Sequence, residues 1–251
     1  MSDKVWIFAD YKQAEVMVVA WAGPIPSLKA WFKSGQDVHL EVAKIIAKVV
    51  QENNIKMPGT LFKKPWQTLT KDDEEREKGK QTVHAGNYGL GYERYTLYTG
   101  LPMQYAKVIL DIYHSMFPEI KGGYQKWIDD CLPTIVLPPP FNWPHTFYDR
   151  PGPDRSRAAY ASYAQGTVGL LLVRTLTRCC EVFANLSKEI TVLTPQVIRA
   201  IGLDVQLQIH DGIGVVVPDD KETIAYTCKL IRKEGECPLI IKDDPLVIPL
   251  D

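Results

Sequence analysis

Residues 204–217, DVQLQIHDGIGVVV, decide the fold more than any other stretch of the chain. Two runs of alternating apolar residues are joined there by an Asp-Gly pair, and Asp-Gly between such runs is among the strongest short signals for a β-hairpin. We therefore predict strands over 204–210 and 213–217. His210 and Asp211 are expected at the tip between the two strands.

The rest of the chain is predicted to be mainly helical. A third strand fits 4–9 and a fourth fits 246–249. Two stretches rich in helix breakers, 53–70 and 132–156, are expected to be irregular, the second as a long extended connection. Helical spacing of apolar residues predicts helices over 37–52, 72–86, 102–116, 157–186, 194–201 and 220–234.

These elements predict an α+β fold. A small, largely antiparallel sheet is backed by helices, and a mostly helical insertion separates its first strand from its hairpin. The chain has 251 residues, 45% of them hydrophobic, which is enough for one large or two modest domains with a proper core. Its opening, MSDKVWIFADY, lacks the apolar run of a signal peptide or membrane span, so a cytoplasmic protein is expected.

The cysteine pattern argues against a fold held together by disulfides or by a zinc ion. Five are present, an odd number, and none has C-x-x-C spacing. This pattern disfavours a disulfide framework and a zinc site, and it predicts reduced cysteines that serve in packing. They are Cys131, Cys179, Cys180, Cys228 and Cys237.

Two aspartates each allow a structural and a chemical interpretation. Asp10 ends the run VWIFA where a helix is expected to begin, and Gln13 stands at capping-box spacing from it. Asp211 is equally suited to the tight turn of the hairpin. Taken alone, each carboxylate is explained by local structure.

A helical stripe around residue 84 points towards a nucleotide. Cations suit a polyphosphate, and tyrosine rings offer a surface on which a base can stack. A solvated charged face is the alternative, but such faces seldom end in NYGLGY, where other residues would favour a helix. The stripe has one residue every four positions: Arg76, Lys80, His84, Tyr88 and Tyr92.

Five segments, in order along the chain, together resemble the family A DNA polymerases, the DNA polymerase I type. ADYKQAEVMVVA is similar to their motif A, KQTVHAGNYGLGY to motif B and LQIHDGI to motif C. GQDVHLEVA and RAAYASYAQGT match two intervening signatures. The resemblance implies an antiparallel palm sheet backed by helices with a mainly helical fingers insertion. It implies palm over 1–36 and 131–251, and fingers over 37–130.

The resemblance also implies a two-metal reaction. Asp10 and Asp211 would be the catalytic residues and would hold two magnesium ions, with the backbone carbonyl of Tyr11 as a further ligand. The implied activity is template-directed DNA synthesis, in which a deoxynucleotide passes from a dNTP to a primer 3′-hydroxyl.

Further roles follow from the same resemblance. Tyr88 would stack on the incoming nucleotide, and Glu15 with Tyr92 would close the space around the sugar C2′, which favours deoxynucleotides. The implied dNTP-binding set is Gln13, Glu15, His39, Arg76, Lys80, His84, Tyr88 and Tyr92. The implied primer and template contacts are Arg157, Gln165 and His210.

The sequence departs from the family in ways that predict a partner. The chain carries no counterpart of the thumb or of the first palm strands, and its net charge of −1 is low for a protein that grips a duplex alone. We expect a split polymerase, of phage origin and active in an infected host cell, whose second polypeptide supplies thumb, N-terminal palm and a 3′–5′ exonuclease. A truncated fragment is the rival explanation.

Three substitutions alter positions that the family uses. Gly212 replaces the glutamate that follows the motif C aspartate, Lys80 replaces an arginine, and Ala161 replaces an asparagine. The loss of the glutamate leaves open a catalytically degenerate subunit that keeps the fold and binds DNA or a partner.

Overall fold

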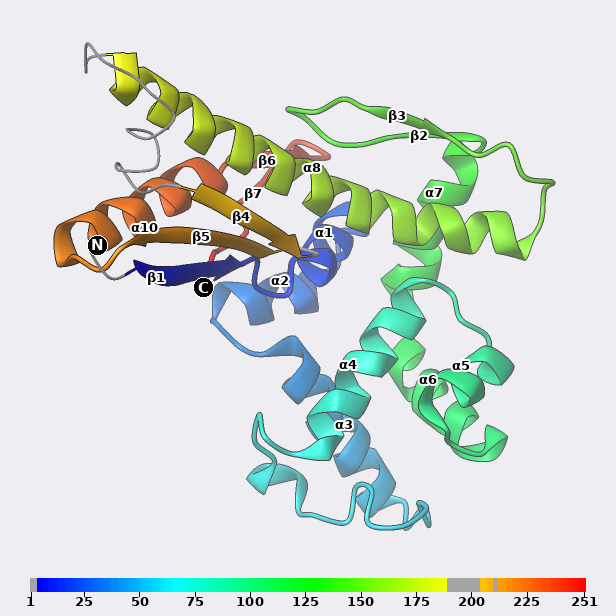
Figure 1. The fold of residues 1–251 in the computed structure, drawn as a ribbon. Helices are drawn as coiled ribbons and strands as arrows, with labels where there is room; N and C mark the ends of the chain where they lie inside the picture. Colours follow the sequence, from blue (N-terminus) through cyan, green and yellow to red (C-terminus); the bar gives the residue numbers. More distant parts are fainter. Residues whose placement is uncertain (1–3, 189–203, 210–211) are drawn as a thin grey trace. The chain divides into compact units, whose positions relative to one another are not determined.

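The computed structural model describes residues 4–188, 204–209 and 212–251 (Figure 1). The chain divides into two compact units. The first, here called the sheet unit, comprises Met1–Ala14, Pro138–Phe141 and Gln165–Asp251. The second, the helical unit, comprises Glu15–Leu137 and Asn142–Ala164. Each unit is described by itself.

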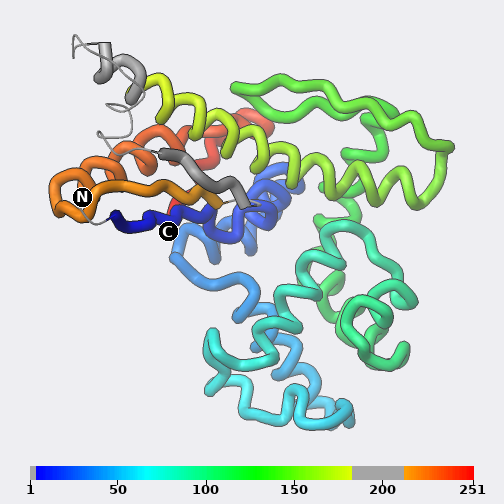
Figure 2. Tube along the Cα trace, in the orientation of Figure 1, coloured from blue at the N-terminus to red at the C-terminus, as the bar shows by residue number. Residues whose placement is uncertain are grey.

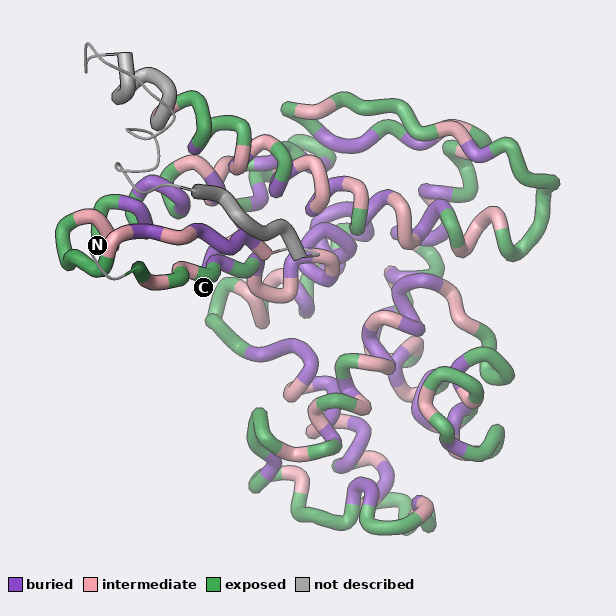
Figure 3. The backbone as a smooth tube through the Cα atoms, viewed as in Figure 1, coloured by how far each residue is buried: buried purple, intermediate pink, exposed green. Residues whose placement is uncertain are grey.

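The sheet unit is built on three antiparallel strands in the order β1-β5-β4. They are β1 Lys4–Asp10, β4 Asp204–Ile209 and β5 Gly212–Pro218. β5 is largely buried, whereas β1 alternates between exposed and more buried residues (Figure 3). This alternation is typical of a strand with one solvated face.

Helix α10, Lys221–Gly235, packs against β1 and β5 (Figure 1). Asp220 caps it, because its side chain accepts a 2.8 Å hydrogen bond from the N–H of Thr223. A second, two-stranded sheet pairs β6 Leu239–Ile241 with β7 Asp244–Leu246. The long helix α8, Pro153–Lys188, runs through both units.

The helical unit is organised around α3, Val38–Glu52, and α4, Glu74–Asn87, which lie side by side (Figure 2). Gly79 permits this close approach, because a Cβ there would lie 2.1 Å from the carbonyl oxygen of His39. Gly86 likewise lets α4 approach the helix Met103–Met116, because a Cβ there would lie 2.3 Å from the ring of Tyr113. The helices are α1 Ala14–Ala22, α2 Pro26–Lys33, α3 Val38–Glu52, α4 Glu74–Asn87, α5 Tyr92–Thr99, α6 Met103–Met116 and α7 Lys126–Cys131.

Shorter elements complete the helical unit. Trp66–Thr68 forms a 3₁₀ turn, and Ile120–Gln125 forms a π-helical segment that leads into α7. The strands β2 Thr134–Val136 and β3 Pro144–Thr146 pair as a small antiparallel hairpin.

The predicted α+β class is confirmed: helices combine with small antiparallel sheets. The helices expected over 37–52, 72–86, 102–116 and 220–234 are present with ends within two residues, and α8 begins four residues before its predicted start. The helix predicted over 194–201 lies outside the described residues. Within the part of the chain that the structure describes, no helix is both long and apolar enough to cross a membrane.

Two expectations about the second half of the chain are wrong. The strand predicted over 246–249 is instead β7, which ends at Leu246. Lys242 and Asp243 both take positive φ angles, of 50° and 63°, and make the tight turn that pairs β7 with β6. The stretch 132–156 is not wholly extended, because it contains the β2–β3 hairpin.

The short helices α2, α5 and α7 were not predicted. Each has at most eight residues, too few for an apolar period to stand out. All five cysteines are free, as expected. Cys179 is buried and serves in packing, but Cys131, Cys180 and Cys228 are exposed and do not.

Candidate functional site

Asp10 is the last residue of β1, and its side chain is exposed. It stands opposite Gly212 of β5. On its other side, its N–H donates to the carbonyl of Asp251 at 3.1 Å, and its carbonyl accepts from the N–H of Asp251 at 3.0 Å. Helix α1 begins only at Ala14, so the N-cap position belongs to Gln13, whose φ is 49°. The interpretation of Asp10 as the N-cap residue is therefore wrong.

Tyr11 anchors the end of β1 in the interior of the sheet unit. Its side chain is 1% exposed, and its hydroxyl bonds Thr175 Oγ1 at 2.7 Å and donates to the carbonyl of Gly235 at 3.0 Å. Burial raises the pKa of Tyr11 to about 12, so the hydroxyl stays protonated. The buried ring therefore fixes the backbone beside Asp10.

The hairpin beside Asp10 forms as the sequence predicts. β4 ends at Ile209 and β5 begins at Gly212, and these two residues are paired. His210 and Asp211 stand between them in the sequence and lie outside the described residues. β5 pairs with β1, so Asp10 lies beside the strand that begins one residue after Asp211 in the sequence.

A second group of predicted residues gathers in the helical unit. The hydroxyl of Tyr88 donates a hydrogen bond to Oε2 of Glu15. Nδ1 of His84 lies 3.6 Å from the same oxygen. The centroids of the His84 and His39 rings lie 5.8 Å apart. The start of α1 and the end of α4 thereby share one polar cluster.

His39 is the buried member of this cluster. It is 4% exposed, and neither ring nitrogen has a hydrogen-bond partner among the described residues. Burial, followed by the nearby charge of His84, lowers the pKa of His39 to about 3. A buried imidazole with two unpartnered nitrogens is suited to a polar ligand.

The guanidinium of Arg76 is paired with the carboxylate of Asp37. Its Nε and Nη2 donate to Oδ2 of Asp37 at 3.1 and 2.8 Å. Burial by itself would raise the pKa of Asp37, but the hydrogen bonds from Arg76 and from the N–H of Leu40 lower it below its usual value. Lys80, one turn further along α4, is exposed.

The four-residue stripe does not continue along one helix. α4 ends at Asn87, and Gly89 takes a positive φ of 69°. Tyr92 begins α5, where its hydroxyl donates to Oδ1 of Asp111 at 2.6 Å. The structure therefore places Tyr88, but not Tyr92, in hydrogen-bond contact with Glu15.

Two of the three predicted DNA contacts, Arg157 and Gln165, lie on α8, and His210 lies outside the described residues. In the helical unit Arg157, near the start of α8, pairs with Asp154 one turn earlier. Gln165 is exposed and belongs to the sheet unit. Sequence reasoning missed three partners of predicted residues: Asp37, Asp111 and Asp251. Only Asp37 had a local signal, as a capping residue before the helix over 38–52.

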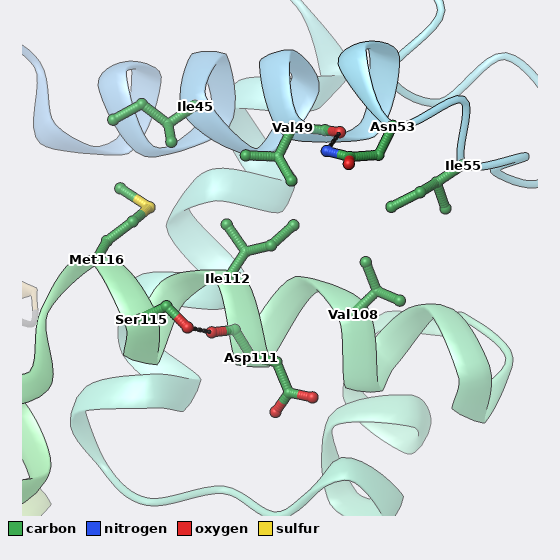
Figure 4. Close-up of a pocket in the computed structure, with 9 residues that line it drawn as sticks. All are labelled: Ile45, Val49, Asn53, Ile55, Val108, Asp111, Ile112, Ser115 and Met116. Carbon is green, nitrogen blue, oxygen red and sulfur yellow. Dashed lines mark hydrogen bonds between the residues drawn. The ribbon is translucent and has the colours of Figure 1, made fainter.

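The helical unit also has a groove of about 620 Å³ between α3 and α6 (Figure 4). Its walls are mainly aliphatic, and the amide of Asn53, the residue after α3, donates to the carbonyl of Val49 in that helix. Among the residues that the structure describes, its lining contains no histidine, unlike the cluster around Glu15, where Nδ1 of His84 lies 3.6 Å from the carboxylate. The lining residues are Ile45, Val49, Asn53, Ile55, Val108, Asp111, Ile112, Ser115 and Met116.

Comparisons with known proteins agree on one family. A model of DNA polymerase family A matches residues 1–239. The chain is 22% identical over 260 residues to the thermostable DNA polymerase I of Thermus filiformis and 23% identical over 241 residues to DNA polymerase I of Deinococcus radiodurans. These matches cover 100% and 90% of this chain but 26% and 21% of the relatives.

A solved structure shares the fold. The match is to the POL domain of Pol1 from M. smegmatis, in complex with DNA primer-template and dNTP. The TM-score is 0.72 at 18% sequence identity, over 99% of this chain and 39% of the other. Since the family model covers nearly the whole sequence, this chain belongs to DNA polymerase family A.

Proposed function

We propose that this chain catalyses template-directed DNA synthesis as the catalytic subunit of a split family A polymerase. The reaction transfers a deoxynucleotide from a dNTP to a primer 3′-hydroxyl with release of pyrophosphate. One observation carries the proposal: Asp10 ends β1 opposite Gly212, the residue that follows Asp211 in the sequence. We assign Asp211 to the same site from its place in the sequence, one residue before the strand partner of Asp10.

Asp10, Asp211 and the backbone carbonyl of Tyr11 are proposed to hold magnesium. The donor chemistry fits, because magnesium prefers carboxylate and carbonyl oxygens together with substrate phosphates. The exposed side chain of Asp10 is accessible to such an ion. When bound, two magnesium ions supply a lowered pKa for the primer hydroxyl and stabilise charge on the α-phosphate and the leaving pyrophosphate.

The dNTP is proposed to bind the cluster around Glu15. His39 offers two unpartnered ring nitrogens, and Lys80 and His84 add donors on the adjoining helix face. Tyr88 supplies a ring for stacking on the base and sugar. Glu15 closes the space at the sugar C2′, so that a 2′-hydroxyl is rejected. Gln13, Arg76 and Tyr92 are proposed to line the same site.

The domain assignment follows from these roles. Residues 1–36 and 131–251 form the palm, and 37–130 form the fingers. Arg157, Gln165 and His210 contact primer or template. A contact near the primer terminus would align the attacking oxygen.

A second polypeptide is proposed to supply thumb, N-terminal palm and proofreading. The net charge of −1 favours additional cationic surface from elsewhere. Trp6 and Phe8 of β1 are 50% and 63% exposed and stack on each other with ring centroids 5.6 Å apart. Exposed aromatic pairs of this kind are typical of a surface that another chain covers.

Primer extension with magnesium and dNTPs tests the proposal. The chain is assayed alone and with the polypeptide that co-purifies with it, as wild type and with Asp10→Asn or Asp211→Asn. We expect extension by the wild-type complex and none by either variant. Asp219→Asn, an exposed carboxylate just beyond β5, is the matched control and should extend like wild type.

The alternative is a degenerate subunit that binds DNA or a partner without catalysis. Gly212 favours it, because the family carries a carboxylate at this position. A well-folded complex that binds primer-template but does not extend it would establish this alternative. Extension by Asp211→Asn at the wild-type rate would place the active site outside this chain.

A further inference from the structure

Two arginines of the helical unit converge on one oxygen of Asp154. Nη2 of Arg94, on α5, donates to Oδ1 of Asp154 at 2.8 Å, and Nη2 of Arg157, near the start of α8, donates to the same oxygen. Arg94 and Asp154 are 60 positions apart in the sequence. The fold therefore brings two guanidinium groups, from two different helices, to one point.

This point is open to solvent. The side chain of Asp154 is 77% exposed and that of Arg94 is 56% exposed, whereas that of Arg157 is 20% exposed. Hydrogen bonds from Arg157 and then from Arg94 lower the pKa of Asp154, so its carboxylate is charged at neutral pH. Exposed ion pairs contribute little to folding stability. Stability alone is therefore a weak reason for two arginines to meet here.

Two further features favour an anion that has more oxygens than a carboxylate. Nε of Arg157 is buried and has no hydrogen-bond partner among the described residues. A phosphate offers several oxygens to guanidinium groups and matches their planar fork. The point also lies at the N-terminal end of α8, Pro153–Lys188, where the helix dipole favours negative charge. Arg94 and Arg157 thus have the arrangement that a phosphate requires.

We propose that Arg94 and Arg157 together bind one backbone phosphate of the DNA, and that Asp154 occupies the place of this phosphate in the free protein. The inference rests on the proposed function, in which Arg157 contacts primer or template, and it adds Arg94 and Asp154 to that contact. When DNA binds, a phosphate oxygen replaces Oδ1 of Asp154 between the two guanidinium groups. The displaced carboxylate turns into solvent.

Because Asp154 competes with the DNA, two kinds of substitution have opposite effects. Loss of the Arg94 guanidinium removes an attraction for the phosphate and weakens DNA binding. Loss of the Asp154 charge removes the competitor and tightens DNA binding. An ion pair that serves only the fold predicts no such opposition, since either substitution breaks the same bond.

Fluorescence anisotropy with a labelled primer-template measures the affinity at several salt concentrations, with the chain alone and with the polypeptide that co-purifies with it. We expect Arg94→Gln to weaken binding about fivefold and to reduce the slope of log affinity against log salt by about one, the share of one phosphate contact. Arg94→Lys keeps the charge but loses the fork, so its affinity should lie between those of Arg94→Gln and wild type. Asp154→Asn should tighten binding about two- to fivefold, the range for one exposed ion pair.

Lys126 and Asp130 of α7 provide the matched control, because they form an exposed ion pair of 2.8 Å. Lys126→Gln and Asp130→Asn change the net charge as Arg94→Gln and Asp154→Asn do. They should alter DNA affinity by about twofold or less, since salt screens exposed charges that do not touch the DNA. Effects of equal size in the two pairs would mean that only overall charge acts, which overturns the proposal.

A double variant shows whether Asp154 acts through Arg94. In the Arg94→Gln protein, Asp154→Asn should tighten binding less than it does in wild type, because one of the two guanidinium groups that it releases is missing. Tightening of full size in that background contradicts the exchange of carboxylate for phosphate. Circular dichroism checks that each variant is folded.

Two readouts separate this phosphate site from the proposed function. The KM for dNTP should be unchanged in Arg94→Gln, because the bound phosphate belongs to DNA; a higher KM with unaltered DNA affinity assigns the two arginines to the nucleotide instead and overturns the proposal. If the wild type binds primer-template but does not extend it, the proposed function fails while the affinities still decide the phosphate site. A wild-type protein that does not bind primer-template rules the site out.

Discussion

Asp10 and Asp251 exchange two backbone hydrogen bonds, of 3.1 and 3.0 Å, on the side of β1 that faces away from β5. Lys12 adds a third bond, from its N–H to the carbonyl of Pro249 at 3.1 Å. The end of β1 is therefore held from both sides, by Gly212 and by the segment 249–251. A strand end supported in this way can present a carboxylate in a fixed direction.

Removal of residues 249–251 is expected to destabilise the protein and to slow primer extension, because three backbone bonds next to Asp10 are lost. Each bond contributes about 1 kcal/mol, so the melting temperature should fall by several degrees. Asp251→Ala is the control. It keeps the backbone bonds and loses only the exposed ion pair with Lys12, so it should behave nearly as wild type. Equal melting temperatures for wild type, the deletion and Asp251→Ala would show that the backbone bonds of residues 249–251 do not stabilise the end of β1.

Tyr11→Phe is expected to lower the free energy of unfolding by about 1–3 kcal/mol. The carbonyl of Gly235 loses its 3.0 Å bond from the hydroxyl and Thr175 loses its 2.7 Å bond to it, whereas the Thr175 hydroxyl can donate to the carbonyl of Leu171 at 2.8 Å instead. Urea unfolding measures the change. Tyr148→Phe, at a position 93% exposed, is the control and should match wild type. A Tyr11→Phe protein as stable as wild type would show that the hydroxyl contributes nothing net.

Gly79→Ala is expected to cost about 1–3 kcal/mol by overpacking. The new Cβ would lie 2.1 Å from the carbonyl oxygen of His39 and 3.1 Å from Cβ of Ala43, so α3 and α4 would have to separate. Gly169→Ala in α8 is the matched control, because a Cβ there meets no atom within 4 Å. It should stabilise the helix by about 0.5–1 kcal/mol. Denaturant midpoints of the two variants should therefore shift in opposite directions.

His39 is expected to make the fold sensitive to acid. A histidine in the unfolded chain has a pKa near 6.5, whereas burial lowers the pKa of His39 in the folded protein to about 3. Between these values the unfolded state binds more protons, so stability falls as the pH falls. The contribution between pH 7 and pH 5 is about 2 kcal/mol.

Urea unfolding at pH 8, 7 and 5 checks this dependence. His39→Gln should show a smaller loss between pH 7 and pH 5 than wild type. Between pH 8 and pH 7 the two proteins should respond alike, since His39 is then largely neutral in both states. Parallel profiles over the whole range would mean that His39 does not remain neutral in the folded protein.

The sequence by itself determined the elements whose signals are local. Alternating residues around an Asp-Gly turn specify the β4–β5 hairpin, and long apolar periods specify α3, α4, α6, α8 and α10. The order of five motifs identified the family, which the family model then confirmed. The short hairpin β6–β7 is not predicted from the sequence, because its turn, Lys242-Asp243, lacks the glycine that usually marks such turns.

Only the tertiary structure decided the partners of the polar side chains. Tyr88 and Tyr92 follow His84 at the same four-residue spacing, yet one meets Glu15 and the other Asp111. Arg76 likewise meets Asp37 from the start of α3. The physical reason is that a helix forms from residues close together in the sequence, so its apolar spacing can be recognised in the sequence alone. A hydrogen bond between residues 73 positions apart, as between Glu15 and Tyr88, depends on how the fold brings the start of α1 to the end of α4.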